Sequence, residues 1–188
     1  MNTDSLKHQL LIAMPQLEDP NFHHSVTYLI EHNDEGAMGL TINRGVEATL
    51  HDVLEDLEIE LEKPLSSRHT VVVGGPVQPA AGFILHPPTG TTYDSTVAIA
   101  DDLWLTTSQD ILEAIAAGEG PETSLLALGY AGWGPGQLEE EMAQNAWLSA
   151  PVSNTDIFFE VPLADRWHVA ASRLGVDLNL ISTGVGHS

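Results

Sequence analysis

Short runs of apolar and β-branched residues, separated by turn-forming residues, recur along most of the chain. Runs bounded by Gly, Pro or Asn in this way are typical of β-strands. The runs that predict strands are Leu10–Met14, Ser25–Glu31, Ala37–Asn43, Thr70–Gly75, Gly82–His86, Thr96–Ala100, Ser124–Ala131 and Asp156–Glu160. Between the second and third runs, the segment EHNDEGA predicts a hairpin turn, because Asn33 and Gly36 tolerate turn conformations.

Apolar residues at helical spacing predict helices between these strands. The predicted helices follow Thr49, follow Thr107, cover Gln137–Asn145, and extend from Pro162 to Gly175. Thr49 with Asp52, and Thr107 with Asp110, have the three-residue spacing of a capping box. Grouped strands with irregularly interspersed helices predict an α+β fold, as a single domain over residues 1–188 with a large mixed β-sheet and a few flanking helices.

Composition narrows the class of protein further. With 188 residues, of which 43% are hydrophobic, the chain can form a normal core. It contains no cysteine, which excludes disulfides and cysteine-ligated zinc and fits a reducing compartment. The apolar run Leu10–Met14 is too short for a signal core or a membrane span, so we expect a cytoplasmic protein with no membrane attachment.

The charge is strongly unbalanced, with 6 basic against 27 acidic residues and a formal net charge of −21. Such a surface favours solubility, or the selection of a basic protein partner. It argues against nucleic acid as a partner, because a DNA-binding protein commonly neutralises about 6–10 phosphates with Lys and Arg. We therefore expect no direct DNA binding.

Familiar catalytic motifs are missing. Neither Lys7 nor Lys63 lies in a P-loop pattern, and the chain has no G-x-S-x-G or H-E-x-x-H segment. The nine histidines show no metal-ligand spacing, so no metal and no cofactor is predicted. The neighbouring His23 and His24 are expected to point apart in either an extended or a helical backbone.

The segment GYAGWGPGQLEEE, residues 129–141, is the strongest local candidate for a site. Its glycines permit a close turn between a strand and a helix, and Pro135 suits a helix entry. A helix amino terminus can bind an anion, but Glu139 and the two glutamates after it would repel one. A tight structural joint is favoured over a binding loop, and alanine at Gly132 or Gly134 is expected to lower stability by more than about 1 kcal/mol if the turn needs positive φ there. Trp133 keeps the binding alternative open, as a core residue or a binding platform.

Several segments together resemble the AlgH/YqgE family of bacterial proteins. They are LLIAMPQLEDPNF, SVTYLIEHNDEGAMGLTINR, VVVGGPV, GFILH and GYAGWGPGQLEEEMAQNAWL, in an order that covers nearly the whole chain. The resemblance implies a single α+β domain with a large mixed sheet and no established enzyme activity. Some members of the family carry the label of transcriptional regulator. This chain departs from the family pattern at His24, Gly45, Ala80 and Ala81, and the last two replace an acidic and a basic residue common in the family.

The residues that match the family and could form a site are Asn43, Arg44, His86, Trp133, Gln137 and Glu139. Turn, capping or packing roles are the simpler interpretation of each. The favoured function is a non-enzymatic domain that binds a protein partner or a small ligand. The alternative is an enzyme that acts on a small anionic substrate at the glycine-rich loop, with Arg44 binding the anion and His86 as the base. A transcriptional regulator is the least favoured hypothesis.

Overall fold

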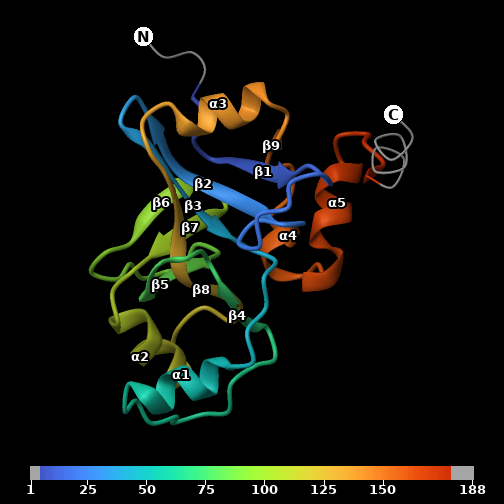
Figure 1. The fold of residues 1–188 in the computed structure, drawn as a ribbon. Helices are drawn as coiled ribbons and strands as arrows, with labels where there is room; N and C mark the ends of the chain where they lie inside the picture. Colours follow the sequence, from blue (N-terminus) through green and yellow to red (C-terminus); the bar gives the residue numbers. More distant parts are fainter. Residues whose placement is uncertain (1–4, 179–188) are drawn as a thin grey trace.

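One strongly curved sheet forms the centre of the fold in the computed structural model, which describes residues 5–178 (Figure 1). The strands are β1 Gln9–Ala13, β2 Val26–Asn33, β3 Gly36–Thr41, β4 His69–Val73, β5 Val77–His86, β6 Val97–Ala100, β7 Leu103–Thr106, β8 Ser124–Trp133 and β9 Trp147–Pro151. Their order is β6-β7-β5-β8-β3-β2-β1-β9, and β4 pairs with β8 outside this path. The β4–β8 pair is parallel and all the other pairs are antiparallel, so the sheet is mixed, as predicted.

Strand β8 connects the two halves of the sheet. Its first half, up to Leu128, pairs with β4 and β5, Tyr130 still pairs with Val77 of β5 after a register shift, and its last residues, from Ala131, pair with β3. Gly129 lies between these halves and has a φ of 77°. The strand therefore bends at Gly129, where it leaves one group of partners and joins the next.

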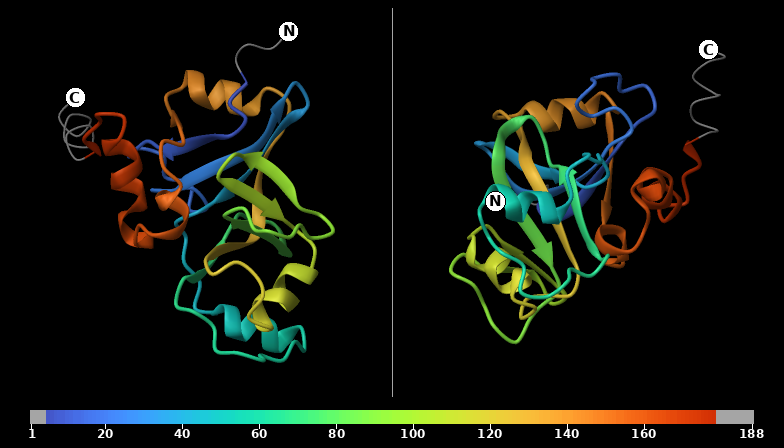
Figure 2. Two further views of the ribbon diagram at one scale, coloured as in Figure 1. Left: turned by 180° about the vertical axis from the view of Figure 1, so that it is seen from behind. Right: turned by 90° about the horizontal axis from the view of Figure 1, so that it is seen from below.

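Within residues 5–178, five α-helices pack around the sheet (Figures 1 and 2). They are α1 Leu50–Asp56, α2 Asp110–Ala116, α3 Gln137–Ala143, α4 Asp156–Phe159 and α5 Arg166–Ser172, and the 3-10 turn Leu163–Asp165 precedes α5. Helices α1 and α2 lie at one end of the molecule and α3 lies at the other. Three hydrophobic clusters fill the spaces between these helices and the sheet.

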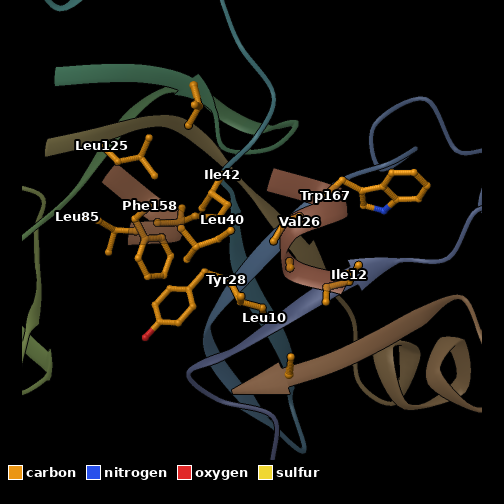
Figure 3. Close-up of a cluster of buried hydrophobic side chains, with 14 of the residues drawn as sticks. Leu10, Ile12, Val26, Tyr28, Leu40, Ile42, Leu85, Leu125, Phe158 and Trp167 are labelled. Carbon is orange, nitrogen blue, oxygen red and sulfur yellow. The ribbon is translucent and has the colours of Figure 1, made fainter. Parts of the chain in front are cut away.

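The largest cluster joins the sheet to α4 and α5. Tyr28 of β2 and Phe158 of α4 are buried in it, with ring centroids 5.0 Å apart in an edge-to-face arrangement. Trp167 of α5 belongs to the same cluster, and Figure 3 shows it at the margin, away from Leu85 and Phe158. Trp167 is buried, with 7% of its surface exposed, whereas Phe158 is completely buried.

Most predicted elements are confirmed, and the fold class is α+β as expected. The hairpin between β2 and β3 turns after Asn33 and resumes at Gly36. The predicted strand Asp156–Glu160 is wrong, because this segment forms the helix α4. Asn154 accepts a hydrogen bond from the Asp156 N–H at 2.9 Å, and the apolar residues that follow are buried on one helical face. A short apolar run does not distinguish a strand from a buried helix.

Two strands, β7 and β9, were not predicted, and each is only four or five residues long. At the start of α1, the capping box of Thr49 and Asp52 is confirmed by reciprocal hydrogen bonds of 2.9 and 3.2 Å. The capping box of Thr107 and Asp110 is wrong. Thr107 instead bonds to Ser95, at 2.7 Å through its N–H and 3.0 Å through its hydroxyl, and α2 begins without a side-chain cap.

A membrane span would need a helix far longer and more uniformly apolar than any found between residues 5 and 178.

Candidate functional site: a basic pocket

A pocket of about 350 Å³ lies where the loop before β2, the end of β3 and the start of α5 meet. Polar and aromatic side chains dominate its wall. The lining residues are His23, His24, Asn43, Arg44, Gly45, Leu163, Ala164, Trp167 and His168. Two of the six residues suggested by the sequence, Asn43 and Arg44, are thus neighbours in one concave site.

Three aromatic rings stack in a column in this pocket. The ring centroids of His23 and His24 are 3.8 Å apart, and those of His24 and Trp167 are also 3.8 Å apart. The planes differ by 22° and 13°, so the rings are nearly parallel. The expectation that His23 and His24 point apart is wrong, because His24 has a φ of 57° and the left-handed backbone turns the two side chains to the same side.

Asn43 holds the loop against the sheet. Its Oδ1 accepts a hydrogen bond from the Val26 N–H at 2.9 Å, and its Nδ2 donates to the His24 carbonyl at 2.9 Å. Both polar atoms of the side chain are therefore used within the protein. Asn43 orients His24, and through it the ring column.

Arg44 supplies a positive charge beside the column. One terminal nitrogen donates to the carbonyls of His23, at 3.1 Å, and Asn21, at 3.3 Å. Its Nε is buried and has no hydrogen-bond partner among the described residues. No described carboxylate lies within ion-pair distance of Arg44, whereas Lys7, Arg68 and Arg173 all form ion pairs.

Arg166 carries a second positive charge, and it adjoins the pocket residues in sequence because it precedes Trp167. This side chain is buried, and its guanidinium donates only to backbone carbonyls, of Val161 at 2.9 Å and Ile42 at 2.6 Å. Burial lowers the pKa of Arg166 to about 10, so it stays protonated at neutral pH. A buried charge with no carboxylate within ion-pair distance in the described chain is unfavourable, and a nearby anion would compensate it.

The pocket histidines influence each other's protonation. Burial lowers the pKa of His24, and the positive charges of His23 and His168 lower it further. The Nδ1 of His23 lies 3.0 Å from the Leu17 carbonyl, and because a carbonyl only accepts, this nitrogen carries the proton. An anion in the pocket would favour the protonated form of His24.

Trp133, Gln137 and Glu139 lie together at the junction of β8 and α3, and none lines the basic pocket. Gln137 Oε1 accepts from the Gly134 N–H at 2.9 Å, and Glu139 Oε2 lies 3.2 Å from the buried His32 Nε2. Trp133 is buried against Phe22, with ring centroids 5.7 Å apart. These contacts make the glycine-rich segment a strand-to-helix joint.

The joint uses different glycines from those predicted. Gly132 and Gly134 do not have positive φ, and the atoms nearest to an added Cβ would lie at ordinary distances of 3.7 and 3.9 Å. The left-handed residues of the segment are Gly129 and Gly136, with φ of 77° and 75°. The prediction of strain at Gly132 and Gly134 is therefore wrong.

His86 is completely buried in β5, and neither of its ring nitrogens is free. Nδ1 donates to the Pro87 carbonyl at 2.8 Å, which leaves Nε2 to accept from the Thr106 hydroxyl, also at 2.8 Å. Burial lowers the pKa of His86, so the neutral ring is favoured. The arrangement holds β5 against β7, and the structure does not bring His86 to the pocket of Arg44.

One group of possible metal ligands occurs in the described part of the chain. Side-chain atoms of His51, Asp52 and Glu55 lie within 4.8 Å of one another on the surface of α1. Asp52 already serves the helix cap by accepting from the Thr49 N–H. The group is explained as an exposed helix face.

Local sequence patterns identified Asn43 and Arg44 but missed His23, His24, Arg166, Trp167 and His168. The pocket joins segments from three parts of the chain, and the hydrogen bond from Arg166 to Ile42 spans 124 positions. The composition gave only an indirect signal. The chain has only 6 basic residues, so an arginine close in space to a pair of histidines is unusual, but the sequence does not show that these residues are close.

Comparison with known proteins gives a consistent result over the whole chain. The AlgH-like family pattern matches residues 10–179. A UPF0301 protein of Alcanivorax borkumensis is 57% identical over 187 residues, covering 100% of this chain and 98% of its own. The UPF0301 protein AlgH of Pseudomonas aeruginosa is 51% identical over 184 residues, covering 97% of this chain and 96% of its own.

Two solved structures have similar folds. The solution structure of AlgH from Pseudomonas aeruginosa superposes with a TM-score of 0.76 at 50% identity, covering 97% of this chain and 95% of that chain. A crystal structure of a protein from Corynebacterium diphtheriae gives a TM-score of 0.70 at 21% identity, covering 93% and 90%. Because the sequence identity to the Corynebacterium diphtheriae protein is only 21%, this similarity concerns the fold alone.

Proposed function

The chain belongs to the AlgH-like family, and we propose that it is a non-enzymatic, cytoplasmic protein that binds a small anionic ligand in the basic pocket. One observation carries the proposal. Arg44 and Arg166 form no ion pair with a described carboxylate, although the chain has 27 acidic residues. Arg44 lines a pocket that also holds three histidines, and Arg166 donates to the carbonyl of Ile42, the residue before Asn43 of this pocket. In so acidic a protein, an unneutralised basic concavity is the expected form of an anion site.

The size of the pocket supports a small ligand. A volume of about 350 Å³ is at the lower end of the range for small-molecule sites. The net charge of −21 repels large polyanions at long range, so we continue to expect no binding of duplex DNA. The alternative of an enzyme with His86 as its base has less support, because both ring nitrogens of His86 are occupied.

We expect Arg44→Gln to weaken the binding of inorganic phosphate by at least about tenfold at neutral pH and low ionic strength. The expected loss reflects a charge-assisted hydrogen bond, worth about 1.5–3 kcal/mol. Glutamine keeps an amide that can reach a backbone carbonyl, so the loop has a replacement for one bond. Isothermal titration calorimetry measures the effect.

Arg68→Gln is the matched control, because Arg68 lies outside this pocket and is paired with Glu160 at 3.8 Å. Its phosphate affinity is expected to stay within about twofold of the native value. Absence of phosphate binding to the native protein, or an equal loss in both variants, would contradict the proposed site.

Binding is also expected to tighten as the pH falls. Sulfate is the suitable probe, because its charge stays constant between pH 8 and pH 6. In the free protein, burial and the charges of His23 and His168 lower the pKa of His24, whereas a bound anion raises it. Protons are therefore taken up on binding, and we expect sulfate affinity to increase on the order of tenfold from pH 8 to pH 6.

His24→Asn tests the origin of this pH dependence, since asparagine tolerates the left-handed backbone at this position. The variant is expected to bind sulfate with a flatter pH profile while its affinity at pH 8 changes little. A native profile that is flat, or that rises with pH, would show that the histidines do not face the anion.

A further inference from the structure

We propose that the anion bound in the basic pocket is carried by a planar aromatic group, and that the ligand class is a nucleoside monophosphate or a closely similar heteroaromatic phosphate. This inference rests on the proposed function and specifies its ligand. It follows from the ring column, from the place of Arg44 beside it, and from the size of the pocket.

The column is fixed at its inner end. Trp167 is buried, and its Nε1 donates to the Ala13 carbonyl at 2.8 Å, so the indole plane is set by the sheet. His24 stacks on this indole, and its backbone conformation places His23 on the opposite face of His24. The column is thus built outward from the core, one ring upon the next.

The outer end of the column is exposed and oriented. His23 is solvent-exposed, and its Nδ1 holds the Leu17 carbonyl at 3.0 Å, which limits rotation of the ring. His24 is the only described aromatic ring that contacts His23, so no ring covers the outer face of His23. An oriented and uncovered ring at the end of a stack can accept a further planar ring.

The positive charge lies next to this exposed ring. A terminal nitrogen of Arg44 donates to the backbone carbonyl of His23 at 3.1 Å, and both residues line the same pocket, so the guanidinium binds the residue that carries the outer imidazole. A ligand with an aromatic ring and a phosphate a short distance apart would contact both features. A carbohydrate phosphate would contact only Arg44, and an uncharged nucleobase would contact only the ring column.

The volume of the pocket and the net charge of the protein favour the small members of this ligand class. A pocket of about 350 Å³ suits a mononucleotide, and a net charge of −21 disfavours a polynucleotide. Stacking of a nucleobase on an aromatic side chain tightens binding by at least about fivefold in other proteins, whichever base is used.

The experiment compares four probes by calorimetry at pH 8: adenosine 5′-monophosphate, ribose 5-phosphate, adenosine and inorganic phosphate. We expect the nucleotide to bind at least about fivefold more tightly than ribose 5-phosphate, and adenosine to bind more weakly than either. Equal affinities for the nucleotide and ribose 5-phosphate would overturn this inference and leave the anion site intact. If neither phosphate ester nor inorganic phosphate binds, the proposed function fails as well.

Two variants of the exposed His23 test the stack itself. His23→Ala is expected to remove the preference for the nucleotide, so that the nucleotide and ribose 5-phosphate bind this variant with affinities within about twofold of each other. His23→Phe keeps an aromatic face and is expected to restore the preference for the nucleotide. A nucleotide preference that survives in His23→Ala would place the base elsewhere and overturn the role of the column.

Discussion

Replacing Gly129 by alanine is expected to lower the free energy of unfolding by about 2–5 kcal/mol. Gly129 has a φ of 77°, and in that conformation a side chain costs roughly 1–2 kcal/mol. An added Cβ would lie 2.5 Å from the Gly75 carbonyl oxygen and 3.0 Å from that of Val77. Both are backbone atoms at the point where β8 passes between the halves of the sheet, so relief requires the strands to move, at roughly 1–3 kcal/mol. Urea unfolding followed by circular dichroism measures the loss.

Gly132→Ala is the matched control, three residues further along the same strand. Gly132 is exposed and has no positive φ, and the atoms nearest to an added Cβ are side-chain atoms at 3.7 and 3.8 Å. The free energy of unfolding of the Gly132→Ala variant is expected to differ from the native value by less than about 1 kcal/mol. The reduced entropy of its unfolded chain contributes a small gain in stability. Similar losses in the two variants would show that the bend at Gly129 is not the cause.

The elements predicted best are those whose signals are local. The capping box of Thr49 and Asp52 is complete within four residues, and the turn after Asn33 depends only on residues that tolerate its backbone. Segment Asp156–Glu160 carries no such signal, since its five apolar or acidic residues fit either a strand or a short helix. Its helical form comes from contacts with the core, where Phe158 packs against Tyr28.

The candidate site was predictable only in part, for a related reason. Asn43 and Arg44 follow a predicted strand, and polar residues at strand ends attract attention. Their partners do not, because His24 reaches the pocket through a left-handed backbone and Trp167 arrives from the other end of the chain. His86 shows the opposite error, since a histidine at a strand end suggested a base, but Thr106 and Pro87 occupy both its nitrogens.

Glu141 is the residue whose removal most directly tests the joint between β8 and α3. Its Oε1 accepts hydrogen bonds from the indole N–H groups of Trp133 at 3.0 Å and Trp147 at 2.9 Å. Its Oε2 accepts from Gln137 Nε2 at 2.9 Å. Both indoles are buried and pack edge to face, with centroids 6.0 Å apart, so one carboxylate satisfies two buried donors and links the strand, the helix and β9.

Glu141→Ala is expected to destabilise the protein by about 2–4 kcal/mol, because each buried donor left without a partner costs about 1–3 kcal/mol. Glu141→Gln keeps an acceptor oxygen for the indoles but places an amide opposite Gln137, so we expect a loss of about 1 kcal/mol. Glu140→Ala is the control, since the neighbouring Glu140 is exposed, and its change should stay within about 0.5 kcal/mol.

Denaturant unfolding gives these free energies, and the indole N–H resonances of Trp133 and Trp147 report the bonds directly. In Glu141→Ala both resonances should shift and exchange faster with solvent, whereas in Glu140→Ala they should keep their native positions. Equal stability of Glu141→Ala and Glu140→Ala, with unshifted indole signals, would mean that the carboxylate does not hold the joint.

Because Phe22 stacks on Trp133 and lies next to His23, loosening of this joint is also expected to disturb the loop that carries the ring column. Phosphate titration of Glu141→Ala therefore measures how far the joint supports the pocket, and we expect weaker binding than in Glu140→Ala.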